Sequence, residues 1–212
     1  MPPRREFVPG LATNATEPTM LSSVIVPSHA LLAALLLAAV VTDIRSRRIP
    51  NKLVLCGIAV ALVVHAIAMA TGTPSPAGRT WWAPLAGLAT GFALLLPLHL
   101  VHAMGAGDVK LMAMVGAFVG STTALDVALY TFVAGGALAL VFMLGRGVAA
   151  QTLANVRFML TDLAQRASTG QGARLAPLQV TAAPLPYAIA IALGTGVAIA
   201  WPLARSFKGV IG

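Results

Sequence analysis

Two aspartates stand beside long apolar runs in this chain. Asp43 ends the apolar run 30–41, and Asp108 opens another one directly after Gly105-Ala106-Gly107. A carboxylate at or within the boundary of a bilayer is costly, so such a residue is by default a candidate for function. Two carboxylates at one membrane face can share a proton and hydrolyse an amide bond, as in aspartic proteases.

The other acidic residues are placed less well for this chemistry. They lie in a polar N-terminal stretch, in a predicted outer loop and on a predicted surface helix: Glu6, Glu17, Asp126 and Asp162. By elimination, Asp43 and Asp108 are the expected catalytic pair, each at the predicted cytoplasmic end of a membrane span. In such a pair the ionised member takes a proton from water while the protonated member polarises the carbonyl.

The neighbours of the two aspartates favour this assignment. Gly105 and Gly107 remove side chains beside Asp108, which lets the backbone turn tightly and a substrate strand approach. Asp108 is then expected at the start of a helix, where the helix dipole favours its ionised form. Pro50 is expected to break the first helical element, and Asn51 is a good N-cap for the next one.

Each aspartate also has a purely structural interpretation. Asp43 could pair with Arg47 or Arg48 at the membrane interface, and Asp108 could be a simple N-cap. Lys110 could tune the pair or bind a lipid phosphate, but an interfacial anchor is the favoured interpretation.

The composition indicates a polytopic membrane protein. Of the 212 residues, 58% are hydrophobic and 9% are charged, and the mean hydropathy is +0.87; these values are far from those of soluble domains. The net charge of +8 is better explained by topology and anionic lipid than by nucleic acid, which is not an expected partner.

The sequence offers no metal site and no cofactor-binding motif. Cys56 is the single cysteine, so neither an intrachain disulfide nor a cysteine-based metal site can form. The chain also lacks a zinc H-E-x-x-H motif, a G-x-S-x-G nucleophile elbow and a Walker loop. We therefore expect chemistry that needs neither a metal nor a cofactor. His99 and His102 are interpreted as interfacial polar residues.

Hydrophobic stretches predict an all-α bundle with about six transmembrane helices, at 22–42, 53–71, 83–102, 109–120, 125–145 and 185–204. The fourth stretch is short and contains glycine, so it is expected to pack among the other helices. Apolar residues at helical spacing predict a cytoplasmic amphipathic helix at 149–167. Residues 1–20 form a flexible tail or precede a true start at Met20, and 21–212 form one membrane domain.

The distribution of lysine and arginine predicts the orientation. A cytoplasmic 43–52 loop leaves outside only five of the fourteen basic residues: Arg4, Arg5, Arg79, Arg205 and Lys208. Positive charge favours the cytoplasmic side, so both termini are expected outside. Trp81 and Trp82 then fit the aromatic belt at the outer surface.

Three pieces of the sequence together resemble the type IV prepilin peptidases, which are membrane aspartic proteases with a G-x-G-D motif. The pieces are Asp43 with Arg47-Arg48-Ile49-Pro50-Asn51, then Gly105-Ala106-Gly107-Asp108-Val109-Lys110, and the late Pro186-Tyr187-Ala188-Ile189-Ala190. A lone G-x-G-D motif is weak, but the ordered set at span boundaries is specific. The resemblance covers about residues 21–205.

The resemblance implies a function and its residues. The family's catalytic aspartates map onto Asp43 and Asp108, and Pro186 and Tyr187 either line the site or only begin a helix. The implied reaction removes a basic leader from a prepilin or pseudopilin at the cytoplasmic face of the bacterial inner membrane. The implied partners are that precursor, the lipid bilayer and the pilus or secretion assembly machinery.

One departure from the family pattern points to a branch of the family. Larger members carry a cytoplasmic segment with paired cysteines and also methylate the new terminus, whereas Cys56 has no partner here. The chain resembles the short, peptidase-only branch associated with Flp-type pili. Two alternatives are an ion-coupled transporter, whose inverted repeats are not evident, and a non-enzymatic assembly subunit.

Overall fold

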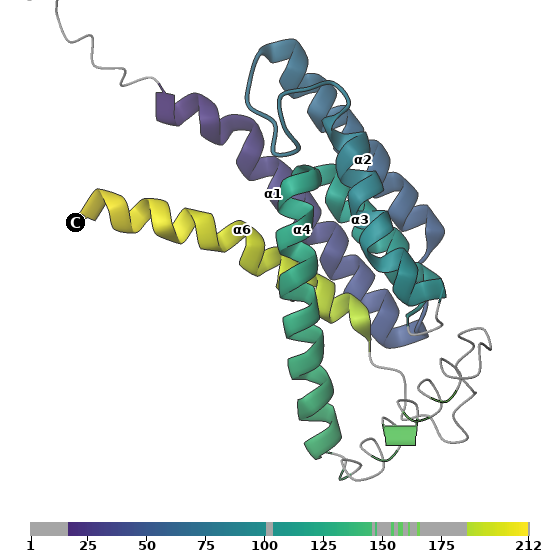
Figure 1. The fold of residues 1–212 in the computed structure, drawn as a ribbon. Coiled ribbons are helices and arrows are strands. Elements are labelled where there is room, and N and C mark those ends of the chain that lie inside the picture. Colours follow the sequence, from purple (N-terminus) through teal and green to yellow (C-terminus); the bar gives the residue numbers. More distant parts are fainter. Residues whose placement is uncertain are drawn as a thin grey trace, which may run out of the picture.

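The computed structural model describes residues 17–100, 104–145 and 186–211, together with isolated positions between 147 and 165. The elements of these residues are helices: α1 (Glu17–Ser46), α2 (Asn51–Thr71), α3 (Ala83–Leu100), α4 (Ala106–Gly145) and α6 (Tyr187–Ile211) (Figure 1). The first four are long and apolar enough to cross a membrane, and α6 contains a shorter apolar segment. The predicted all-helical membrane bundle is confirmed.

Helix α1 extends beyond both predicted ends of the first span. It begins at Glu17 and ends at Ser46, so Asp43 lies within its last turn and does not follow the helix. Arg47 ends the helix with a left-handed φ of 52°, and its N–H donates to the Asp43 carbonyl at 2.8 Å. This conformation costs a non-glycine residue about 1–2 kcal/mol, and it ends α1 sharply.

The connection between α2 and α3 is folded over the ends of these helices. Helix α2 ends at Gly72, a left-handed C-cap residue. The ring of His65, a buried residue of α2, lies 2.8 Å from the hydroxyl of Ser75 and 3.0 Å from the carbonyl oxygen of Thr80, and both of these residues follow Gly72. The imidazole of His65 therefore binds two residues of the connection, Ser75 and Thr80.

Helix α4 consists of two arms that meet at Gly120. Gly120 has φ 81° and ψ 171°, which breaks the helix between 106–119 and 121–145, and Figure 1 shows the second arm turning back from this point. At the other ends of the arms, the Tyr187 ring lies against Gly135 of the second arm, and the charge of Asp108 in the first arm acts on Tyr187. The predicted fourth and fifth stretches are therefore both helical, but the predicted loop between them is replaced by the kink at Gly120. Asp126, which was expected in that loop, is an exposed residue of the second arm.

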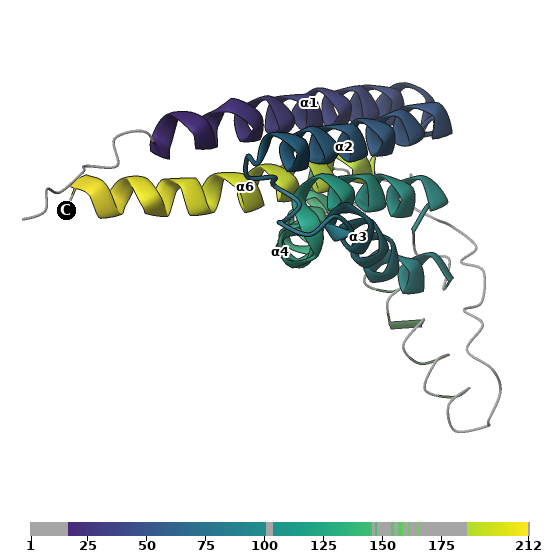
Figure 2. The same ribbon diagram turned by 90° about the horizontal axis from the view of Figure 1, so that it is seen from above.

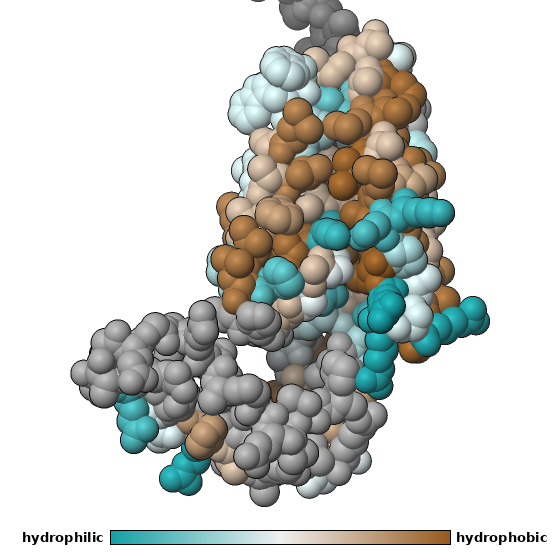
Figure 3. All heavy atoms as spheres, turned by 90° about the vertical axis from the view of Figure 1, so that its right-hand side faces the viewer, coloured by the Kyte–Doolittle hydropathy of each residue, from teal (hydrophilic) through white to brown (hydrophobic). Residues whose placement is uncertain are grey.

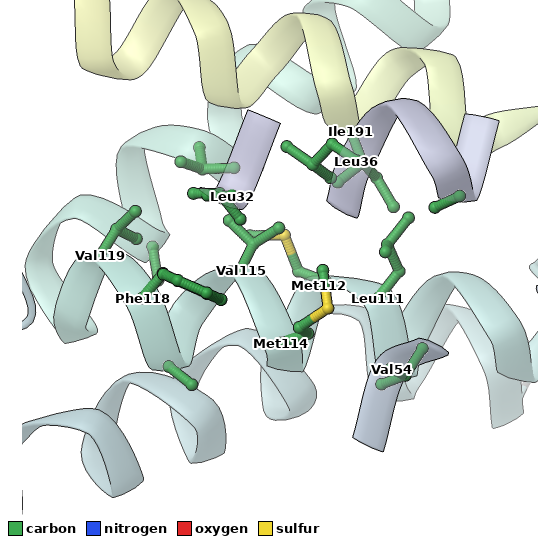
Figure 4. Packing of buried hydrophobic residues seen from close by; sticks show 14 of the residues in the cluster. Leu32, Leu36, Val54, Leu111, Met112, Met114, Val115, Phe118, Val119 and Ile191 are labelled. Atoms are coloured by element: carbon green, nitrogen blue, oxygen red, sulfur yellow. The ribbon is translucent and has the colours of Figure 1, made fainter. Parts of the chain in front are cut away.

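The first arm of α4 is the centre of the bundle. All its residues from 111 to 119 are buried, as expected of a helix that is apolar all round, and the prediction that this short span packs among other helices is confirmed. Figure 4 shows its side chains against α1, α2 and α6: Leu111, Met112, Met114, Val115, Phe118 and Val119 meet Leu32, Leu36, Val54 and Ile191.

Helix α3 approaches this arm at glycine contacts. A Cβ at Gly87 would overlap the Gly116 carbonyl, a Cβ at Gly116 would overlap the Gly87 carbonyl, and a Cβ at Gly91 would overlap the carbonyl of Met112. Small residues permit this close contact between helix backbones in membranes. The pairs also show that α3 and the first arm run antiparallel.

The outer surface of the bundle is apolar. Large hydrophobic side chains such as Leu55, Val63 and Leu140 are more than half exposed, and Figure 3 shows an apolar band on one face with hydrophilic side chains toward its lower end. Lipid tails would cover such a band. The amphipathic helix predicted at 149–167 lies almost entirely outside the described residues.

Gly116→Ala should destabilise the bundle by about 1–3 kcal/mol, because a methyl group there meets backbone of α3 and forces the two helices apart. Thermal unfolding in detergent measures the effect. Gly136→Ala is the control, since a Cβ at Gly136 meets no atom within 4 Å. Equal melting temperatures for both variants would contradict the glycine contact.

Candidate active site

Asp43 is buried at the end of α1 and is bound to the start of α6. Its side chain is 8% exposed, and its Oδ2 accepts a hydrogen bond of 3.3 Å from the backbone N–H of Ala188. Ala188 lies in the first turn of α6, where backbone N–H groups lack a partner within the helix. The positive end of the α6 dipole therefore faces the carboxylate.

The interfacial ion pair considered for Asp43 is absent. Within the described residues, Asp43 forms no ion pair with an arginine, and Arg45, Arg47 and Arg48 are all exposed. The arginines thus lie in solvent or at lipid headgroups around the site. They add positive charge to this end of the bundle, which we call the carboxylate end.

Asp108 occupies the first turn of α4. Its N–H donates to the Gly105 carbonyl at 3.2 Å, and the Gly105 backbone also forms a hydrogen bond with its carboxylate. A Cβ at Gly105 would lie 3.3 Å from Asp108 Oδ2, which is a tight contact with the carboxylate. The carboxylate is therefore held at a helix N-terminus, as predicted, although as a first-turn residue and not as the N-cap.

The two carboxylates belong to one site. Asp43 from α1 and Asp108 from α4 are close enough for their charges to act on one another, and the charge of Asp108 also acts on Tyr187. Three helices thus converge at the carboxylate end: the last turn of α1 and the first turns of α4 and α6. The sequence predicted this juxtaposition from span ends alone.

The connection between α1 and α2 packs against the start of α4. A Cβ at Gly107 would lie 3.4 Å from the Cβ of Ile49, so this glycine allows the two segments to touch. Pro50, in an extended conformation, is the N-cap of α2 and has no side-chain cap. The prediction that Asn51 caps α2 is wrong. Instead, Asn51 Oδ1 accepts a hydrogen bond of 3.1 Å from Lys110 Nζ, and both residues are exposed.

Pro186 and Tyr187 both lie at the site. The Pro186 carbonyl accepts a hydrogen bond of 3.3 Å from Ile189 N–H and so begins α6. The Tyr187 ring rests against Gly135, where a Cβ would come within 2.9 Å of Cε2. The contact of Ala188 with Asp43 could not be predicted from the sequence, because Ala188 binds through a backbone N–H that almost every residue type supplies.

The histidines that the structure describes do not form a metal centre. The described residues contain no group of three histidine, cysteine or acidic side chains able to hold a metal ion. His99 instead lies with Nδ1 3.0 Å from the Met104 carbonyl oxygen, and so supports the connection that leads to Asp108. His102 lies outside the described residues.

A family model described as "Type IV leader peptidase family" matches residues 30–140. The chain belongs to the type IV leader peptidase family. The matched region includes Asp43 and Asp108 and ends before Pro186 and Tyr187. No curated protein and no solved structure matches the chain. Membership makes this membrane protein a peptidase, and it favours that function over a transporter or an assembly subunit.

Gly105→Ala should lower the turnover of the peptidase roughly tenfold, because small displacements of a reacting group are costly and the new Cβ would press on Asp108 Oδ2. The measurement is kcat for substrate cleavage, with thermal unfolding recorded in parallel. Gly145→Ala, in open space at the end of α4, is the control. Normal turnover of the Gly105 variant would mean that Asp108 is not held as tightly as the structure indicates.

Proposed function

We propose that the protein is an aspartic endopeptidase that removes the basic leader from type IV prepilins or pseudopilins of the Flp type. The observation that carries the proposal is the meeting of Asp43 and Asp108, from separate helices, at one end of an apolar bundle. Membership of the type IV leader peptidase family supports the substrate class. The short, peptidase-only branch fits a chain whose single cysteine, Cys56, has no partner.

The reaction needs one ionised and one protonated carboxyl group, the state that two nearby carboxylates favour. The ionised group takes a proton from water, and the water oxygen attacks the scissile carbonyl carbon. The protonated group donates its proton to the carbonyl oxygen, so a neutral tetrahedral intermediate forms. Its C–N bond then breaks as one hydroxyl proton returns to a carboxylate and the amine nitrogen gains the proton of the other carboxyl group.

Backbone groups around the two aspartates hold their carboxyl groups in place for these two roles. Ala188 N–H binds Asp43, and the Gly105 backbone binds Asp108, so neither carboxylate depends on a mobile side chain for its orientation. Preorganised donors of this kind need no rearrangement during the reaction.

The distribution of charge supports a site that faces the cytoplasm. Four exposed basic residues lie at the carboxylate end, at the end of α1 and the start of α2: Arg45, Arg47, Arg48 and Lys52. Trp81 and Trp82, 75% and 50% exposed, lie in the connection at the opposite end. Positive charge inside and an aromatic belt outside give the orientation that brings a cytoplasmic leader to the aspartates.

Labelling of single cysteines tests this orientation. In a Cys56→Ser background, Arg48→Cys should react with a membrane-impermeant maleimide only after the membrane is opened. Arg79→Cys, exposed at the other end, should react in intact spheroplasts because it is expected outside. The reverse pattern would contradict a cytoplasmic site.

The catalytic pair is tested by Asp43→Asn and Asp108→Asn. Each change keeps the size of the side chain but removes the ionisable group, so each should lower prepilin cleavage at least about a thousandfold. The double variant should be scarcely worse, because the two groups act as a unit. Cleavage is measured by the mobility shift of the precursor on co-expression.

Asp126→Asn is the matched control, because this acid is exposed in the second arm of α4, close to Gly120 and far from the pair. It should cleave normally. Membrane levels of all variants are compared by immunoblot, so that loss of protein is separated from loss of chemistry. Near-normal cleavage by a well-expressed variant of either paired aspartate would remove the basis of the proposal.

A further inference from the structure

An apolar groove with a volume of about 330 Å³ lies between α1 and α6. Its α1 wall includes His29, Ala33 and Val40, and its α6 wall includes Ile189, Ala192 and Gly196. Figure 1 shows these two helices separating toward the start of α1 and the end of α6, and Figure 2 shows both along one side of the bundle. The groove is therefore a feature of the outer, lipid-facing surface.

One end of the groove is adjacent to the carboxylate pair. Val40 lies less than one turn before Asp43 in α1, and Ile189 directly follows Ala188, whose N–H binds Asp43. From there the groove follows α1 within the candidate span Ile25–Ser46. His29 and Val40 are 11 residues apart in the sequence, which corresponds to about 16 Å of helix, or about three turns.

The lining of the groove suits a helix better than a lipid tail. Ala192 and Gly196 are four residues apart on α6, and Ala33 faces them from α1; such small residues let a third helix backbone approach closely. A Cβ at Gly196 meets no atom of the chain within 4 Å, so packing inside the bundle does not account for this glycine. A flexible acyl chain does not require small residues at helical spacing. It also does not require a groove that ends at the two aspartates.

We propose that this groove docks the apolar helix of the substrate, with the scissile bond at the end beside Asp43 and Asp108. The inference rests on the proposed function, since it assumes a precursor that is anchored in the membrane by such a helix. Docking along α1 and α6 would fix the depth of the cleaved bond relative to the carboxylates. The groove thereby selects substrates whose cleavage site immediately precedes an apolar helix.

Filling the groove tests the proposal. Gly196→Leu and Ala33→Leu each project a large side chain into it from opposite walls. Both should lower cleavage of the full-length, membrane-anchored prepilin roughly tenfold or more, as expected for overlap in a packed interface. Cleavage of a soluble peptide that spans the same bond but ends before the apolar segment should be unchanged.

The chain offers closely matched controls. Gly136→Leu also enters open space, and Ala34→Leu alters the exposed neighbour of Ala33; neither residue lines the groove. Both should cleave the anchored precursor normally. Normal cleavage by the two groove variants would overturn the docking site, and equal loss on both substrates would show an effect on the aspartates instead. Failure of the wild type on every substrate would refute the proposed function separately.

Crosslinking provides a readout that does not depend on cleavage. In a Cys56→Ser, Asp108→Asn background, Leu193→Cys in the groove should form a disulfide with a cysteine placed in the first turns of the prepilin's apolar segment. Leu129→Cys is the control, because Leu129 is similarly exposed on α4 but lies outside the groove. Equal crosslinking at the two positions, or no crosslinking at either, would overturn the proposal. Lipid would then be the expected occupant of the groove.

Discussion

The hydrogen bond between Asp43 and Ala188 constrains the whole arrangement. A carboxylate buried at the boundary of a bilayer needs a partner, and here the partner is the backbone N–H of a residue 145 positions later, in the first turn of α6. The start of α6 must therefore lie beside the end of α1. The same start carries Tyr187, which approaches Gly135 and Asp108. The hydrogen bond from the Ala188 N–H to Asp43 thus links α1 to α6, and the site lies where these two helices meet.

Asp108 reaches this site because the first arm of α4 is buried on all sides. Apolar burial alone does not hold helices together within lipid, so close backbone contact must contribute, and Gly87 and Gly116 supply it. Gly120 then reverses the chain without a loop, which returns the second arm to the level of Tyr187. The glycines of α4 therefore place both Asp108 and the support of α6.

The sequence predicted what depends on local pattern. Asp43 and Asp108 stood out because carboxylates are rare beside apolar runs, and the spans followed from the length of those runs. Long-range partners could not be predicted in this way. The Lys110–Asn51 bond joins residues 59 positions apart, and the Ala188 N–H has no side-chain signature. The reversal at Gly120 was hidden because a glycine in an apolar run is equally typical of tight helix packing.

The filled centre of the bundle also limits how a substrate can reach the aspartates. Residues 111–119 are all buried, so a peptide cannot pass through the middle of the described helices. A second cavity of about 410 Å³ adjoins the end of α2 and Arg79, a helix length of about 30 Å from the carboxylate end. Access to the pair is therefore lateral, along the groove of α1 and α6, or from the basic end itself. A substrate with an apolar helix and a polar leader would use both routes at once, and the bond between those two parts would then lie at the aspartates.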